Sequence, residues 1–148
     1  MTPIDKTAQS QTESISFEFD LHHLPEKVWR ALTDPVLLAE WLLPVVELKL
    51  EPGAAFTLKT RPQPGWDGIV NCRMLEIEAH EKLSYTWVVG DMVLDTVVTF
   101  TLTPTASGTR LYLVQSGFKP EQKQNFGGAR YGWKMMGGKL VALLARIP

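Results

Sequence analysis

The sequence has little cysteine and no long hydrophobic run. Cys72 is the only cysteine among 148 residues, so neither an internal disulfide nor a cluster of thiolate ligands can form within one chain. Its strand-like surroundings predict a buried, unreactive thiol. No stretch approaches the ~20 apolar residues that span a bilayer. Residues 1–14 are polar and do not resemble a signal peptide, so we expect a cytoplasmic protein without a membrane partner.

An excess of charge of one sign is also missing. The chain has 15 Lys and Arg residues against 16 Asp and Glu residues, which gives a net charge of -1. The basic residues are scattered and form no stripe interleaved with aromatic side chains, so we expect no nucleic-acid partner. The hydrophobic fraction of 45% and the length of one ordinary domain predict a single hydrophobic core.

Catalytic and metal-binding signatures are absent as well. There is no nucleophile elbow, no phosphate-binding loop and no histidine-rich spacing. His22 and His23 are adjacent, and neighbouring residues on a strand point to opposite faces, so the two cannot readily share one ion. His80 is expected in a solvated turn. We therefore predict no metal, no cofactor and no catalytic set.

Ionisable side chains nevertheless keep an enzyme open as an alternative. A carboxylate buried in a pocket can have a raised pKa and act as a general base. No two of these groups are paired at a spacing typical of acid–base catalysis. The candidates that could face a pocket are Glu47, Asp67, Arg73, Glu76, Asp91, Asp95 and Arg130.

The first half of the chain predicts a tail, a strand and two short helices. Residues 1–13 are rich in Thr, Gln and Ser and are expected to form a disordered tail. Alternating Ile15, Phe17 and Phe19 predict a half-buried strand. Helical spacing follows from Pro25 and is interrupted before Pro35, where Asp34 can cap a second helix that ends at Trp41.

From Pro44 onward the pattern is typical of β-structure. One face of the predicted sheet is apolar and the other is rich in Thr and Ser, as in antiparallel sheets with one solvated face. A phase change near Leu75 indicates a bulge, which bends a sheet. The predicted strands are 45–50, 54–60, 69–78, 83–88, 98–103 and 111–116.

The C-terminal segment predicts a long helix that covers the apolar face. Its apolar residues recur at spacings of three and four, which places them on one stripe. Several glycines interrupt it, and each interior glycine costs about 0.5–1 kcal/mol relative to alanine, so packing must hold this helix. Gly127-Gly128 marks either a kink or the start of the helix. The stripe is Phe126, Ala129, Trp133, Met136, Leu140, Leu143 and Ile147.

Four motifs resemble the bacterial homologues of the activator of the heat-shock protein 90 ATPase, a family of the SRPBCC (START-like) superfamily. The first is PEKVWRALTDPVLLAEWL at 25–42, similar to the opening helices of that family. The others are EKLSYTWVV at 81–89, GTRLYLVQSGF at 108–118, and Gly132-Trp133 followed by Leu140. The resemblance spans about residues 14–146.

The resemblance implies an α+β helix-grip fold over residues 14–148. In this fold a curved antiparallel sheet of six to seven strands surrounds the long C-terminal helix, with two short helices after the first strand. The chain departs from the family at two positions. Trp41 is followed by Leu42 where a second tryptophan is frequent, and Gln115 stands where the family often has a histidine, which implies a more neutral pocket.

The resulting hypothesis is a non-catalytic protein that binds a small hydrophobic or aromatic molecule between sheet and helix, for sequestration, sensing or stress response. Alternatives are an enzyme of the cyclase, dehydratase or hydrolase type and a co-chaperone-like interaction module. A homodimer is compatible with the sequence, which does not specify one. The predicted ligand-binding residues are Trp41, Phe56, Met74, Tyr85, Trp87, Phe100, Leu113, Gln115, Trp133 and Met136.

Overall fold

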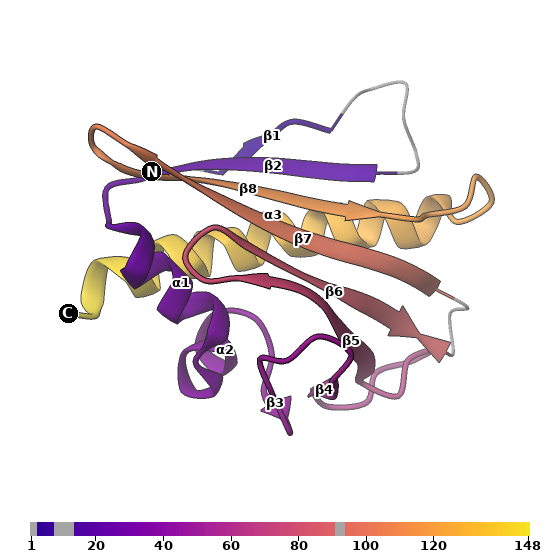
Figure 1. Ribbon diagram of the computed structural model, residues 1–148. Coiled ribbons are helices and arrows are strands. Elements are labelled where there is room, and N and C mark those ends of the chain that lie inside the picture. Colours follow the sequence, from indigo (N-terminus) through magenta and orange to yellow (C-terminus); the bar gives the residue numbers. More distant parts are fainter. Residues whose placement is uncertain (1–2, 8–13, 91–93) are drawn as a thin grey trace.

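A computed structural model describes residues 3–7, 14–90 and 94–148. They form an α+β fold in which one eight-stranded antiparallel sheet curves around a long C-terminal helix, as Figure 1 shows. The strand order is β1-β2-β8-β7-β6-β5-β4-β3. The predicted helix-grip fold is therefore confirmed, with one additional two-residue strand, Ile4–Asp5, at one edge of the sheet. No helix within the described ranges is long and apolar enough to cross a membrane.

The elements follow the predicted order. The strands are β1 (Ile4–Asp5), β2 (Ser14–Leu21), β3 (Val45–Val46), β4 (Ala55–Lys59), β5 (Ile69–Glu78), β6 (Lys82–Val89), β7 (Leu94–Thr105) and β8 (Gly108–Ser116). The helices are α1 (Pro25–Thr33), α2 (Pro35–Trp41) and α3 (Lys123–Arg146).

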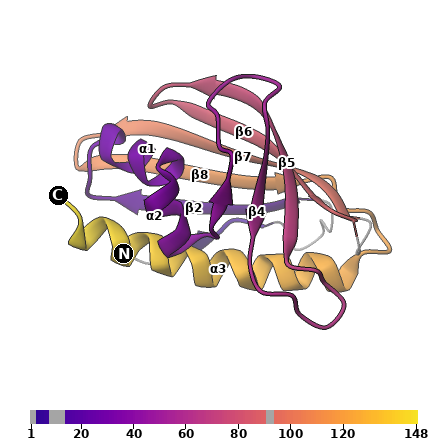
Figure 2. The same cartoon turned by 90° about the horizontal axis from the view of Figure 1, so that it is seen from below.

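The curvature of the sheet has a local cause in β5. The register between β5 and β6 shifts between Met74 and Glu76, where the sequence predicts a bulge. A bulge adds a residue to one strand only, so the strand bends and its twist increases. The strands β4 and β5 consequently turn toward α3, as the view in Figure 2 shows.

Two segments differ from the sequence prediction. Ile4–Asp5 lies in the predicted tail but pairs with β2, and the Thr7 hydroxyl accepts a hydrogen bond from the Ser16 N–H at 3.0 Å. The rest of that tail lies outside the described residues. The predicted strand 45–50 is wrong beyond Val46, because Glu47 has a φ of 60°, which interrupts an extended chain.

The short helices α1 and α2 form the bent pair predicted from Pro35. The Asp34 carboxylate accepts a hydrogen bond from the Val36 N–H at 2.9 Å and so caps α2. The indole N–H of Trp41 donates to the Ala31 carbonyl at 2.8 Å, which ties the end of α2 back to α1. This pair packs beside the C-terminal half of α3 (Figure 2).

The long helix α3 begins at Lys123, before Gly127 and Gly128, so both glycines lie inside it. Its inner face packs on the sheet through the predicted stripe, of which Phe126, Trp133, Leu140 and Leu143 are buried. Gly137 faces the sheet so closely that a Cβ there would lie 2.8 Å from the ring of Phe19. A glycine is therefore needed at 137 for helix and sheet to approach.

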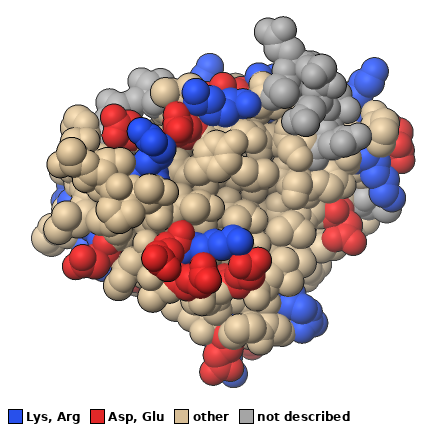
Figure 3. All heavy atoms as spheres, turned by 45° about the horizontal axis from the view of Figure 1, so that its top comes forward, with Lys and Arg blue, Asp and Glu red and all other residues tan. Residues whose placement is uncertain are grey.

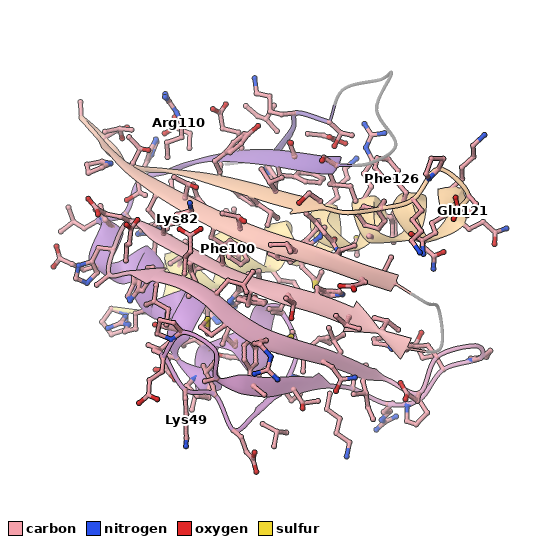
Figure 4. The ribbon with its side chains drawn as sticks, turned by 45° about the vertical axis from the view of Figure 1, so that its right-hand side comes forward. Lys49, Lys82, Phe100, Arg110, Glu121 and Phe126 are labelled. Atoms are coloured by element: carbon pink, nitrogen blue, oxygen red, sulfur yellow. The ribbon has the colours of Figure 1, made fainter. Side chains whose placement is uncertain are left out.

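Phe100 on β7 lies at the centre of the core. Figure 4 shows it between the sheet and α3, whereas Lys49, Arg110 and Glu121 extend outward. Its ring is 6.3 Å from that of Trp41 on α2 and 6.2 Å from those of Tyr85 on β6 and Trp133 on α3. One aromatic cluster thus joins α2, the sheet and α3.

Charges of both signs alternate on the surface. On the face in Figure 3, acidic and basic side chains lie next to one another. Glu18 lies 3.7 Å from both Lys6 and Arg110, and Lys82 lies 3.0 Å from Glu76. Exposed pairs of this kind contribute little to stability, at most about 1 kcal/mol each.

The neighbouring glycines Gly137 and Gly138 make a matched test of helix packing. Both Gly→Ala changes gain about 1 kcal/mol of helix propensity. At Gly138 a Cβ meets nothing within 4 Å, so G138A should raise the free energy of unfolding. G137A should overpack the contact with Phe19, so its free energy of unfolding should be about 1–3 kcal/mol lower than that of G138A. Urea denaturation measures both, and equal stabilities would contradict the close contact.

Candidate functional site

A pocket of about 450 Å³ lies between the sheet and the N-terminal half of α3. Its walls come from the 61–68 loop, from the inner faces of β5 to β8 and from α3, and Figure 2 shows that loop reaching α3. The lining residues are Gln63, Trp66, Val70, Trp87, Val89, Leu94, Gln115, Gln124, Asn125, Gly128, Ala129, Gly132, Trp133 and Met136.

The 61–68 loop is held at its base by close backbone contacts. Gly68 has a φ of +82°, and a Cβ there would lie 2.3 Å from the Thr60 carbonyl oxygen, so only glycine fits. The Thr60 N–H donates to the Gly68 carbonyl at 2.8 Å. The indole N–H of Trp66 donates to the Ile69 carbonyl at 3.1 Å, which fixes this ring at the pocket edge.

Missing side chains on α3 create much of the space. Gly128 and Gly132 lie one helical turn apart and both line the pocket. A Cβ at Gly128 would meet no atom within 4 Å, and one at Gly132 would meet only the Met136 side chain at 3.8 Å. The helix therefore covers the pocket without filling it.

A chain of buried hydrogen bonds forms the inner wall. The indole N–H of Trp133 donates to Oε1 of Gln115 at 2.7 Å, and Nε2 of Gln115 donates to the Thr96 hydroxyl at 2.9 Å. That hydroxyl donates in turn to the Trp87 carbonyl at 2.8 Å. Thr96, Gln115 and Trp133 are each 1% exposed. Buried polar groups satisfied in this way rigidify a core.

Aromatic rings flank this chain of hydrogen bonds. The ring of Trp87 lies 5.4 Å from that of Trp133 at an angle of 54°. Both rings line the pocket, and so does Trp66. Aromatic side chains present large apolar surfaces with a single polar group, so this wall suits an aromatic or hydrophobic molecule.

Sequence reasoning separates pocket from core only in part. Four predicted ligand-binding residues, Trp87, Gln115, Trp133 and Met136, come together in the pocket. The other six do not line it; Phe56 borders a shallow groove, and the remaining five lie in the packed core: Trp41, Met74, Tyr85, Phe100 and Leu113.

The pocket wall formed by the 61–68 loop and the start of α3 was not predicted from the sequence. Trp66 in a loop rich in Pro and Gly was the available signal, because a large aromatic in a loop usually packs on something. The four-residue spacing of Gly128, Gly132 and Met136 was a second signal for one helix face that lacks bulk.

The ionisable candidates lie elsewhere. Among the described residues no Asp, Glu, His, Lys or Arg lines this pocket. Glu47 and Arg73 border a separate shallow groove, Glu76 pairs with Lys82, and Arg130 pairs with Asp5. Asp67 and Asp95 are exposed, and Asp91 lies outside the described residues. His22 is exposed and His23 half-buried, and within the described chain no three His, Cys, Asp or Glu residues cluster as metal ligands.

Burial determines the chemistry of the lone cysteine. Cys72 on β5 is 5% exposed, and desolvation raises the pKa of its thiol from 9.0 to about 12. Burial likewise raises the pKa of the neighbouring Tyr85, and Cys72 adds to this shift. Since the thiolate is the reactive form, the predicted unreactive thiol agrees with this environment.

The fold and the pocket define a START-like helix-grip domain. The model of the family described as "Activator of Hsp90 ATPase homolog 1-like protein" matches residues 22–145. The chain belongs to this family. None of the curated proteins matches the chain significantly.

Solved structures agree with this assignment. Protein MLL2253 from Mesorhizobium loti is 41% identical over 91% of this chain and 98% of its own, with a TM-score of 0.84. Protein CV1439 from Chromobacterium violaceum is 28% identical over 93% and 100%, with a TM-score of 0.76. CalU16 from Micromonospora echinospora, at 22% identity over 98% and 85%, shares the fold with a TM-score of 0.74.

The buried hydrogen-bond chain can be tested at Thr96. Thr96→Val should lower the free energy of unfolding by about 1–3 kcal/mol, because it leaves a buried N–H of Gln115 without its acceptor. Thr101→Val is the matched control on the same strand, since Thr101 lies on the outer face and its hydroxyl bonds to no described residue. Urea denaturation compares the two, and equal effects would contradict the role of Thr96.

The raised thiol pKa predicts a loss of stability in alkali. The folded state keeps the Cys72 proton up to pH about 12, whereas the unfolded chain releases it near 9.0. The stability that comes from the protonated Cys72 thiol is thus complete below pH 9 and is lost as the pH rises toward 12. The free energy of unfolding falls by up to about 1.4 kcal/mol per pH unit over this range. Urea midpoints from pH 8 to 10.5 should fall more steeply for the wild type than for Cys72→Ala; parallel slopes would refute this.

Proposed function

We propose that this protein binds a small hydrophobic or aromatic molecule in the pocket between the sheet and α3, without transforming it. The observation that carries the proposal is a partly open pocket of about 450 Å³ walled by three indoles and by a glycine-bearing helix face. Small-molecule sites commonly have volumes of about 300–1,000 Å³, apolar walls and a few polar groups.

The polar groups of the pocket support binding without catalysis. Its described polar side chains are amides and indoles, from Gln63, Gln115, Gln124 and Asn125 and from the three tryptophans. Amides and indoles do not ionise near neutral pH, so they are poor general acids and bases. The enzyme alternative requires an ionisable group in the pocket, and none of the described candidates lies there.

Sequestration or sensing is the role that fits such a site. A molecule in the pocket would contact both the 61–68 loop and α3, two segments far apart in the sequence. Binding would therefore link the loop to the helix and stabilise the folded protein. A change in the loop on binding would be the signal in a sensing role, and retention of the molecule would suffice for sequestration.

A pocket-filling variant tests the proposal. Gly132→Leu should place a side chain in open space and abolish binding of 2-acetylnaphthalene, a neutral aromatic probe. Gly127→Leu is the matched control, because Gly127 lies on the same helix, has open space around its Cβ position and does not line the pocket. Both changes should preserve folding, since leucine favours helix over glycine.

Thermal denaturation provides the measurement. At ten times its Kd the probe should stabilise the wild type and Gly127→Leu by about 1.4 kcal/mol, which raises the Tm by about 3–5 °C. Gly132→Leu should show no rise. A probe that shifts all three proteins equally, or none of them, would count against this pocket as the binding site.

A further inference from the structure

The geometry points to an uncharged aromatic ligand with a hydrogen-bond-accepting oxygen, and to Gln115 as the residue that selects it. This inference rests on the proposed function and narrows it to a class of ligand. It follows from the direction of the buried hydrogen-bond chain and from the donors left over in the pocket.

The orientation of the Gln115 amide is determined by its neighbours. The indole N–H of Trp133 can only donate, so the amide oxygen must face it at 2.7 Å. Thr96 donates its single hydroxyl proton to the Trp87 carbonyl and must therefore accept from the amide nitrogen, 2.9 Å away. A flipped amide would bring two donors together at Trp133. The nitrogen of Gln115 is thus fixed as a donor.

Two donors on the pocket wall remain without partners. Gln115 has a second amide N–H, and neither this group nor the indole N–H of Trp87 bonds to any residue in the described part of the chain. Gln115 is 1% exposed and Trp87 9% exposed, and both line the pocket. Thr105 Oγ1 is the one buried side-chain N or O atom without a partner among the described residues, so these two donors are not orphaned in the core. A ligand oxygen in the partly open pocket can replace water as their acceptor.

The ligand must also be uncharged. No Lys, Arg or His among the described lining residues could neutralise an anion, and no carboxylate could neutralise a cation. Two neutral N–H groups do not replace the water that an ionised carboxylate loses in an apolar pocket. A carbonyl or hydroxyl oxygen needs only the hydrogen bonds that these donors supply.

The indoles favour an aromatic ring beside that oxygen. Trp66, Trp87 and Trp133 all line the pocket, and the planes of the Trp87 and Trp133 rings are tilted by 54° to each other. Aromatic groups prefer offset or edge-to-face contact with such rings. The amides of Gln63, Gln124 and Asn125 complete the wall with further neutral groups.

Three ligands of similar shape test the selection. These are 2-acetylnaphthalene, 2-isopropenylnaphthalene, in which C=CH₂ replaces C=O, and 2-naphthoate, a carboxylate. Calorimetry at pH 7 gives each Kd. The ketone should bind at least about tenfold more tightly than the carboxylate, because burying an unpaired charge is unfavourable.

The role of Gln115 is isolated by a thermodynamic cycle. Gln115→Met removes the donor, so the ketone should lose one hydrogen bond of about 1.4 kcal/mol while the hydrocarbon loses none. The ratio of the ketone Kd to the hydrocarbon Kd should therefore rise about tenfold in this variant. Tyr112→Phe is the control, a polar group removed from the outer face of the same strand. It should leave the ratio unchanged.

A measurement on the unmodified protein covers a variant that fails to fold. In ¹⁵N-labelled wild-type protein the ketone should shift one Gln115 amide proton downfield, and the hydrocarbon should not. If the ligands bind but the ratio and the amide shift are insensitive to the carbonyl, or if 2-naphthoate binds as tightly as the ketone, the inference is wrong and the proposed function stands. If none of the three binds, both are wrong.

Discussion

The contact of Trp133 with the sheet is the interaction on which the rest of the structure depends. Five glycines within α3 make that helix weak alone, so its stability comes from packing. Trp133 supplies that packing through ring contacts with Phe100 and Trp87, and its hydrogen bond to Gln115 fixes the orientation of its ring. Toward the C-terminus of α3 the stripe fills the core, and toward the N-terminus glycine replaces bulk and the pocket opens.

In this arrangement one residue belongs both to the packed core and to the pocket wall. Gln115 satisfies Trp133 and Thr96 on its buried side, and the same amide contributes to the pocket wall. A histidine at this position would titrate near neutral pH, whereas an amide does not. The described walls of the pocket therefore keep one protonation state near neutral pH, and they offer hydrogen-bond donors and acceptors without charge.

The sequence predicts the fold better than the site because the two depend on different information. Alternation in β2 and the stripe of α3 are periodic signals, and they specify which face is buried. Phe100 and Trp87 carry the same signal, yet Phe100 lies in the core and Trp87 lines a pocket. Both rings contact Trp133, but Phe100 is also flanked by the rings of Trp41 and Tyr85. Trp87 instead borders the space that Gly128 and Gly132 leave open. Pairing of β1 and placement of Trp66 also depend on contacts between distant segments, which local patterns do not contain.

The strand at each margin of the sheet is only two residues long, and this limits how a strand of another chain could pair with the sheet. Ile4–Asp5 and Val45–Val46 expose few unpaired backbone groups, and Glu47 turns the chain away directly after the second. A long, flat margin would be a template for an incoming strand. Among the described residues, these two strands therefore offer an incoming strand few backbone N–H and C=O groups on which to extend the ladder.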